Sequence, residues 1–272
     1  MSAGEHVPGI DPHTPSVARM YDFYLGGKDH FPADRQAAEK IVRLVPEITH
    51  IARANRDFLI RVVRVLVAAG IRQFVDIGTG LPTQQNVHEV ALGAAADCRI
   101  AYVDNDPIVL THARALLADN TRTIVVDADL RDPETITGHP EIRAHLDFDR
   151  PVAVLLFAIL HFVPSDLEAA AIVARLRSAV AGGSYLAMSH SYAGDLSTET
   201  IRAGQAVYRS SSTGSIVPRG VDAVRSFFDG LDLLDPGVVP VDCWRPEWEE
   251  EHEPDFGRPG LLGAVARFPS AG

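Results

Sequence analysis

The chain contains 272 residues, 46% of them hydrophobic, and carries a formal net charge of −11. This length can bury one sizeable core, and the acidic balance argues against a nucleic-acid partner because no basic field offsets phosphate. Two cysteines are too few for a disulfide framework, and the longest apolar run, residues 152–160, is too short to cross a bilayer. Without a signal-peptide pattern at its start, the sequence predicts a soluble cytoplasmic protein.

The first predicted element is a helix that begins near residue 16 and ends in a glycine turn. Three aromatic side chains fall within residues 21–24 and are followed by Gly-Gly-Lys. One interpretation is a packed helix with a glycine C-cap. The other is a lid, in which Tyr21, Tyr24 and the hinge at Gly27 close over a bound ligand. The sequence does not decide between them.

Two further helices are predicted before the first strand, over residues 34–45 and 49–69. Residues 1–70 are therefore expected to form a helical extension or lid. Residues 71–272 are expected to form the main domain, with no linker that would divide the chain into independent units.

From residue 72 the sequence alternates between predicted strands and helices. The strands are strongly apolar, which predicts a parallel sheet covered by helices on both faces. The predicted strands are 73–77, 99–104, 123–127, 152–157 and 184–189. Between them, helices are predicted over 83–95, 106–118 and 165–180, and a further helical segment begins at residue 132. Less regular patterns predict helices near 197–211 and 221–228, and strands over 237–241 and 262–268.

A glycine turn follows the first strand and is the most informative segment of the chain. Residues 76–80 read Asp-Ile-Gly-Thr-Gly, and the glycines at 78 and 80 permit positive φ and close approach of a ligand to the backbone. Pro82 suits the first turn of the next helix. A dinucleotide fingerprint needs a third glycine where Thr83 stands. Asp76 would repel a pyrophosphate and attract a sulfonium, which favours S-adenosylmethionine over NAD.

Acidic residues also follow the second and third strands. Asp104 lies 24 residues beyond Gly80, about the spacing at which a carboxylate accepts both ribose hydroxyls. Asp129 is placed to accept from an adenine amino group, and the N–H of Leu130 is placed to bond a ring nitrogen. The alternative is that such aspartates only cap helices, which suits Asp106 and Asp132 better.

Together, the 76–80 turn, Asp104 and Asp129 resemble the class I S-adenosylmethionine-dependent methyltransferases. More narrowly, the chain is similar to a bacterial methyltransferase family of unassigned substrate. The segments that carry this resemblance are 21–29 (Tyr-Asp-Phe-Tyr-Leu-Gly-Gly-Lys-Asp), 73–83, 86–89 (Asn-Val-His-Glu), 102–107 (Tyr-Val-Asp-Asn-Asp-Pro) and 160–164 (Leu-His-Phe-Val-Pro).

The resemblance implies a Rossmann-like, doubly wound α/β fold whose seven-stranded sheet is mostly parallel and ends in an antiparallel strand, for which 262–268 is the candidate. It implies S-adenosylmethionine as donor and S-adenosylhomocysteine as product. Our leading hypothesis adds a small-molecule acceptor, with methylation at oxygen as one option. The implied donor-binding residues are Tyr21, Tyr24, Gly27, Asp76, Gly78, Gly80, Asp104, Asn105, Asp129, Leu130 and Phe157. It identifies neither the acceptor nor the oligomeric state.

His161 is the candidate catalytic residue. Its Leu-His-Phe context is similar to the Leu-His-Asp-Trp stretch of small-molecule O-methyltransferases, in which the histidine deprotonates a hydroxyl. Here Phe162 replaces the acid, and a histidine at a strand end also serves as a packing residue. A base is needed only where the acceptor must lose a proton.

Other residues are weaker candidates. His190, Tyr192, Trp244 and Trp248 are expected to line an acceptor pocket or to fill the core. The acidic run 249–253 reads as a solvated edge, and no catalytic metal is expected.

Two other functions compete with methyl transfer. The first is a protein that binds S-adenosylmethionine without catalysis. The second is an NAD(P)-linked oxidoreductase, but the only Tyr-x-x-x-Lys of the chain, Tyr24 to Lys28, precedes the first strand.

Overall fold

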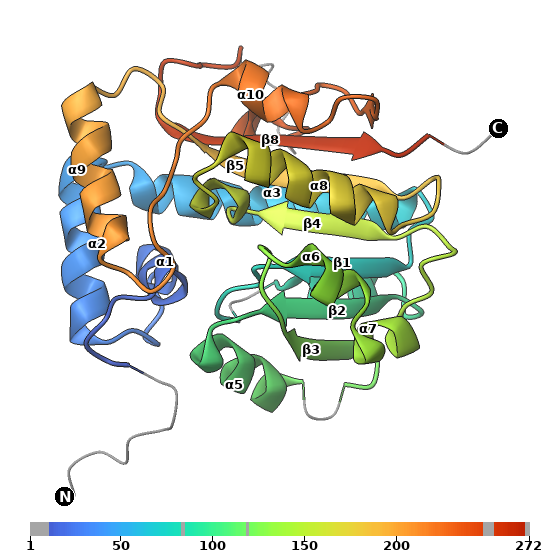
Figure 1. The fold of residues 1–272 in the computed structure, drawn as a ribbon. Helices are drawn as coiled ribbons and strands as arrows, with labels where there is room; N and C mark the ends of the chain where they lie inside the picture. The colour runs from blue at the N-terminus through green and yellow to red at the C-terminus, as the bar shows by residue number, and fades with distance from the viewer. Residues whose placement is uncertain (1–10, 83–84, 118–119, 247–252, 270–272) are drawn as a thin grey trace, which may run out of the picture.

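The structure is a computed structural model that describes residues 11–82, 85–117, 120–246 and 253–269. Its centre is one mixed sheet with strand order β3-β2-β1-β4-β5-β8-β6, and β7 pairs with β8 beside this path (Figure 1). The strands are β1 (Gln73–Ile77), β2 (Arg99–Asp104), β3 (Thr123–Asp127), β4 (Ala153–Phe157), β5 (Tyr185–Tyr192), β6 (Asp232–Leu233), β7 (Val239–Pro240) and β8 (Gly260–Arg267).

Strands β1 to β5 run parallel, and β8 runs antiparallel to β5, as the opposed arrows of β4 and β8 in Figure 1 show. All five residues of β1 are buried, because helices cover both faces of the sheet. The predicted Rossmann-like α/β fold and its antiparallel final strand are therefore confirmed. The two-residue strand β6 was not predicted.

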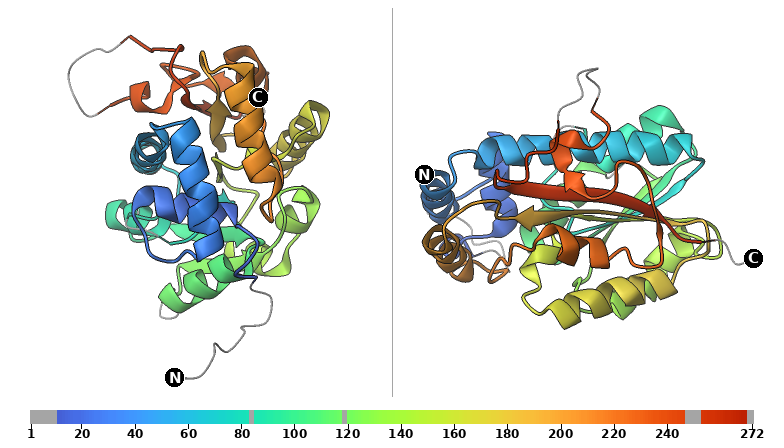
Figure 2. Two further views of the ribbon diagram at one scale, coloured as in Figure 1. Left: turned by 90° about the vertical axis from the view of Figure 1, so that its left-hand side faces the viewer. Right: turned by 90° about the horizontal axis from the view of Figure 1, so that it is seen from above.

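Helices cover the sheet on both faces (Figure 2). Side chains alternate along each strand, so Phe74 faces one core with Phe58 of α3, and Val75 faces the other with Leu176 of α8. The helices of the main domain are α4 (Val87–Ala94), α5 (Pro107–Leu116), α6 (Pro133–Thr137), α7 (Pro140–His145), α8 (Asp166–Ser178) and α10 (Val221–Ser226), with 3-10 turns at Leu160–Phe162 and Val241–Cys243.

The N-terminal helices stand at the carboxyl ends of the parallel strands (Figure 1). They are α1 (Val17–Leu25), α2 (Pro32–Leu44) and the longer α3 (Ile48–Ala68), which runs back along the sheet. α9 (Thr198–Arg209) packs on α2 and completes the group. Gly26 ends α1 with φ of 81°, which is the left-handed conformation expected of a glycine C-cap. The N-terminal extension thus covers the edge of the sheet at which ligands bind in such folds.

Several predicted element boundaries need correction. α4 begins at Val87, where Asn86 and Glu89 form a capping box, so Pro82 does not lie in its first turn. Thr83 lies outside the described residues. α3 begins at Ile48, after Glu47 at its N-cap position, one residue before the predicted start. In the described part of the chain, no helix is both long and apolar enough to cross a bilayer.

Candidate functional site

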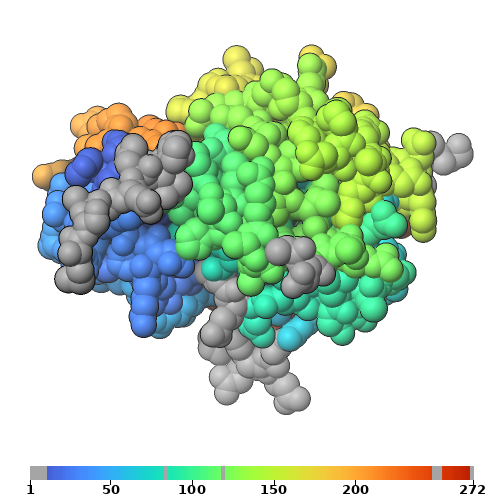
Figure 3. All heavy atoms as spheres, turned by 90° about the horizontal axis from the view of Figure 1, so that it is seen from below, coloured from blue at the N-terminus to red at the C-terminus, as the bar shows by residue number. Residues whose placement is uncertain are grey.

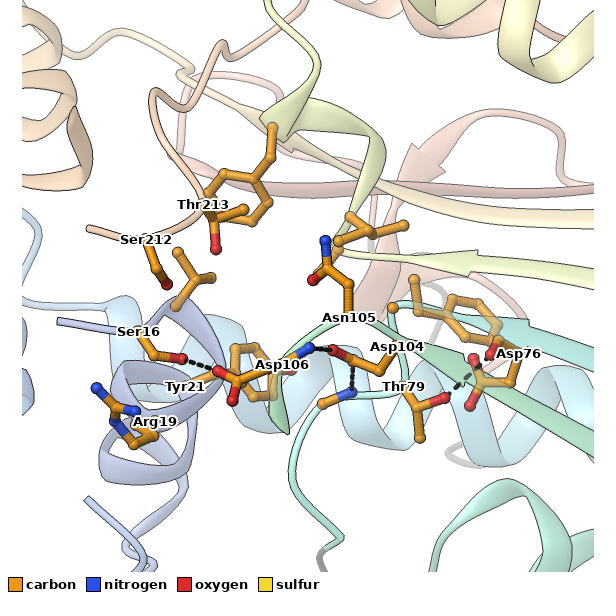
Figure 4. A pocket seen from close by; sticks show the side chains of 18 of the residues that line it. Ser16, Arg19, Tyr21, Asp76, Thr79, Asp104, Asn105, Asp106, Ser212 and Thr213 are labelled. Carbon is orange, nitrogen blue, oxygen red and sulfur yellow. Dashed lines mark hydrogen bonds between the residues drawn. The ribbon is translucent and has the colours of Figure 1, made fainter. Parts of the chain in front are cut away.

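A cavity of about 320 Å³ opens where the strand order reverses between β1 and β4 (Figure 4). Ligands in doubly wound sheets bind outside the carboxyl ends of the strands at this switch point. One wall is formed by the turn after β1 and the ends of β2 and β4, and the other by α1 and α3. We call this space the first cavity. It is lined by several predicted site residues, namely Tyr21, Asp76, Gly78, Gly80, Asp104, Asn105 and Phe157.

The glycine turn has the backbone geometry that its sequence predicted. Gly78 and Gly80 have φ of 74° and 68°, a region that side chains rarely adopt. A Cβ on Gly78 would also meet the side chain of Ile159 at 2.5 Å. Glycine is therefore required at 78 for both conformation and space.

Asp104 holds this turn in place. Its Oδ2 accepts the N–H of Gly80 at 2.9 Å and its Oδ1 accepts the N–H of Asp106 at 2.9 Å (Figure 4). Burial raises the pKa of Asp104 to about 6, against the effect of these hydrogen bonds. Each carboxylate oxygen still has a lone pair for a ligand hydroxyl.

Asp76 is a second carboxylate on the same cavity, and it is more deeply buried than Asp104. Asp76 is 5% exposed, and its burial raises the pKa of the carboxyl group to about 7. The charge of Arg56 lowers this pKa, and the charge of Asp104 raises it further. Nearby, the Oδ1 of Asn55 is buried and has no hydrogen-bond partner among the described residues. Two carboxylates with raised pKa values and an unpartnered amide oxygen form a site that favours a cation with N–H donors.

Arg56 is a cavity residue that sequence reasoning did not assign. It lies on α3 next to Asn55, and its Nη2 donates to the carbonyl of Gln85 at 3.1 Å. Its guanidinium gives the first cavity a positive group beside the two carboxylates, so the site can hold a zwitterion. The sequence signal was that Arg56 falls off the apolar stripe of α3, which is also the pattern of a solvated face.

Asp129 and Leu130 line a smaller recess of about 40 Å³ that shares Gly78, Asp104 and Asn105 with the first cavity. The oxygens of Asp129 accept the N–H of Arg131 at 2.8 Å and the amide of Asn105 at 3.0 Å. The role predicted for Asp129, accepting from an adenine amino group, stays a prediction.

The N-terminal segment and a loop before α10 roof the first cavity. Ser16 donates its hydroxyl to Asp106 at 2.6 Å, which ties α1 to the start of α5. The carbonyl of Pro15 accepts the N–H of Ser212, and Arg131 donates to the carbonyl of Thr213 at 3.2 Å. Seen from below, the blue N-terminal helices adjoin the green segment of β2, α5 and β3 (Figure 3). This arrangement is compatible with a lid, which stays a prediction.

A second cavity, of about 140 Å³, adjoins the first. The two share Val17, Tyr21, Ala158 and Phe162. Ala158 has φ of 51°, a strained conformation for a residue with a side chain, at this junction. The second cavity is otherwise enclosed by α2, α3, α9, the end of β5 and the start of β8.

Tyr24, Tyr192 and His161 line the second cavity, whereas Gly27 lines neither. Gly27 instead packs on Asp22, whose side chain would clash with any Cβ there. Gly27 is thus placed to shape the turn after α1 and not to touch a ligand in either cavity.

His161 is 4% exposed, and one nitrogen of its ring accepts a hydrogen bond from the backbone. The N–H of Ser191 donates to Nδ1 at 3.1 Å, so Nδ1 carries the lone pair and the proton of the neutral ring is on Nε2. Burial lowers the pKa of His161 well below 6.5, and the neighbouring His190 and Arg219 lower it further. The base role of His161 stays a prediction, and this hydrogen bond argues against it.

The remaining candidates divide between cavity and core. His190 is buried under Arg219, which donates to its Nε2 at 2.9 Å, and burial lowers its pKa to about 4. Trp244 is a core residue that packs edge-on against Phe58. Trp248 and residues 249–252 lie outside the described residues. Among the described side chains, no group of three or more potential metal ligands is found.

The sequence as a whole matches one family. The profile of the family described as S-adenosyl methyltransferase aligns with residues 3–269. No curated protein matches the chain.

Two solved structures are similar to this chain over nearly its whole length, and a third shares its fold. A DUF574 family protein from Streptomyces avermitilis is 42% identical with a TM-score of 0.87, covering 95% of this chain and 99% of that one. A candidate methyltransferase from Thermobifida fusca is 40% identical with a TM-score of 0.89, and the match covers 97% of this chain and 98% of that one. An O-methyltransferase family protein from Burkholderia thailandensis shares the fold at 15% identity and a TM-score of 0.51, covering 89% and 61%.

Proposed function

The chain belongs to the S-adenosyl methyltransferase family, and from that premise we propose that it transfers the methyl group of S-adenosylmethionine to a small-molecule acceptor. The observation that carries the proposal is the pairing of Asp76 and Asp104 in the first cavity. Asp76 is buried, Asp104 is half-buried, and both have raised pKa values, so a cationic ligand is favoured there. The donor is a sulfonium that also bears an ammonium group.

The first cavity fits the donor by size and by chemistry. Its volume of about 320 Å³ lies at the small end of the range for ligand pockets, about 300–1,000 Å³. Asp104 would accept from the ribose hydroxyls while it keeps the turn in place. Asp76 and the unpartnered Oδ1 of Asn55 would accept from the ammonium group, and Arg56 would face the donor carboxylate.

At the other end of the donor, the recess at Asp129 and Leu130 would take the edge of the adenine ring. Asn105 and Phe157 would pack against the nucleoside from the ends of β2 and β4. When bound, the donor supplies an activated methyl group. The protein's largest contribution is then alignment, for which about 7–11 kcal/mol is the usual ceiling.

The same carboxylates argue against an NAD(P)-linked oxidoreductase. Gly78 and Gly80 lie beside Asp76, where the pyrophosphate of a dinucleotide would meet negative charge. The second cavity argues against a protein that only binds the donor, because it gives an acceptor access to the same junction at Ala158 and Phe162.

Titration calorimetry with S-adenosylmethionine, S-adenosylhomocysteine and NAD⁺ tests the donor assignment. We expect binding of the first two and none of the nicotinamide. Binding of NAD⁺ without the adenosyl compounds would overturn the proposal. Formation of S-adenosylhomocysteine in the presence of a metabolite extract then separates an enzyme from a non-catalytic binding protein.

A further inference from the structure

The described residues that line the second cavity offer an acceptor no carboxylate or amine that could remove a proton. Among the described residues that line it, none is Asp, Glu, Lys or Arg, and the titratable ones are His161 and four tyrosines. Asp76 and Asp104 line the first cavity instead. The lone pair of His161 is occupied by the N–H of Ser191, and His190 and Arg219, which face it from β5 and the segment before α10, oppose a further positive charge.

The tyrosine hydroxyls are equally unsuited to act as bases. Tyr21 donates to the carbonyl of Ala52 and accepts from Asn55, both at 3.0 Å. Tyr24 and Tyr208 lie with their hydroxyls 3.4 Å apart, and Tyr192 donates to the carbonyl of Phe256. Burial raises the pKa of all four side chains, so they stay protonated near neutral pH.

The shape of the cavity limits the acceptor further. A cavity of about 150 Å³ with apolar walls accommodates benzene, and this one measures about 140 Å³. Phe162 and the tyrosines offer ring faces and edges to an aromatic guest. An anionic acceptor would lose its hydration without gaining a cationic side chain among the described lining residues.

Resting on the proposed function, we infer that the second cavity is the acceptor site and that it takes an uncharged, one-ring aromatic nitrogen base, either an arylamine or an aza-aromatic ring. A phenol, by contrast, has a pKa of about 10 and needs a base before it can attack.

The reaction balances without a protein base. The nitrogen lone pair forms a bond to the methyl carbon, the carbon–sulfur bond breaks, and its electron pair remains on sulfur. The positive charge moves from sulfur to nitrogen. An arylamine then releases its additional proton to water, whereas a methylated aza-aromatic ring keeps the charge.

A series of one-ring probes tests the chemistry, and aniline and phenol within it are matched in size. Aniline, pyridine, phenol and benzoate are compared at saturating S-adenosylmethionine, with S-adenosylhomocysteine formation as the readout. We expect aniline or pyridine to react at least about tenfold faster than phenol or benzoate, with a rate that is flat from pH 6 to 8 because both probes are already neutral. Faster reaction of phenol, with a rate that rises over this pH range, would overturn the inference.

A variant pair tests the location. Gly204 of α9 lines the second cavity and not the first, and a Cβ there meets no atom within 4 Å. Gly204→Phe should fill the cavity and lower the turnover of the nitrogen probe at least about tenfold, with donor affinity within about twofold of wild type. Ala206→Phe adds the same side chain at an exposed position of α9 that lines neither cavity, and as the matched control it should keep both. Equal turnover in Gly204→Phe would place the acceptor elsewhere.

The two proposals fail in different ways. If the donor binds by calorimetry but none of the nitrogen probes reacts, the acceptor inference is wrong and donor binding stands. If S-adenosylmethionine itself does not bind, the proposed function is wrong as well.

Discussion

The two adjoining cavities are built on different physical principles. The first is polar, with a buried carboxylate at Asp76, a half-buried one at Asp104 and a guanidinium at Arg56. The second is apolar and aromatic, and its described lining has no acidic or basic side chain other than His161. With the donor in the first cavity and the acceptor in the second, as proposed, specificity for the donor would be electrostatic and specificity for the acceptor would depend on shape and packing.

The difference extends to how the chain builds each wall. The two carboxylates of the first cavity, Asp76 and Asp104, lie at the ends of the consecutive strands β1 and β2, so short sequence segments position them. The second cavity collects residues from α1, α2, α3, α9, β5 and β8, which span positions 17 to 261. Changes at charged positions should therefore alter donor binding, and changes at apolar positions should alter only the acceptor.

The largest effect is expected at Asp104. Asp104→Asn removes charge-assisted bonds to the donor and weakens the support of Gly80, and we expect donor affinity to fall about 100-fold. Calorimetry measures it. Asp127→Asn is the control, because Asp127 is an exposed aspartate at the end of the neighbouring strand and lines neither cavity. Unchanged affinity in Asp104→Asn would refute the ribose assignment.

A pH dependence is expected from Asp76. As the pH falls from 8 to 5, Asp76, with a pKa of about 7, and then Asp104, with a pKa of about 6, become protonated. The affinity for both S-adenosylmethionine and S-adenosylhomocysteine should fall, because both carry the ammonium group that Asp76 is proposed to bind. Asp76→Asn should weaken donor binding about tenfold at pH 8 and flatten this dependence.

The same substitution should stabilise the ligand-free protein. Because the folded pKa of Asp76 is raised, its contribution to the free energy of unfolding is fully present below pH 3.8 and is lost as the pH rises through about 7. Asp76→Asn should therefore unfold with a free energy higher by at least about 1 kcal/mol at pH 8. Thermal unfolding at pH 5 and pH 8 checks the sign, and a destabilised variant at pH 8 would contradict it.

A smaller effect is expected where the N-terminal helix meets the first cavity. Ser16→Ala removes the hydroxyl that donates to Asp106 at 2.6 Å, and we expect donor affinity to fall about fivefold, equivalent to about 1 kcal/mol. Stopped-flow dissociation should show the donor leaving faster. Ser210→Ala is the control, because its hydroxyl bonds only within its own helix end. Identical dissociation rates would mean that this contact does not retain the donor.

The smallest effect is expected at His161. His161→Asn keeps an acceptor for the N–H of Ser191 but cannot act as a base. We expect the pH profile of turnover to keep its shape, with a rate at saturating acceptor within about threefold of wild type. A loss of turnover above about 100-fold with intact folding and donor affinity would restore the base role of this histidine.

The sequence by itself determined the sheet, the glycine turn and the two carboxylates of the first cavity. Apolar strands between glycine and proline signals identified β1 to β5 and β8, and Asp76, Gly78, Gly80 and Asp104 were recognisable because strand-end turns are local. Helix starts were less predictable, as the later start of α4 shows, because capping depends on side-chain partners.

Only the tertiary structure decided the apolar half. Spacing along the chain could not reveal that Tyr24 of α1 meets Tyr208 of α9, or that the lone pair of His161 is used by Ser191. It also could not reveal that Asn55 and Arg56 turn toward the cavity rather than toward solvent. Local turns and strand ends are encoded by neighbouring residues, whereas a cavity enclosed by distant helices exists only once those helices pack together.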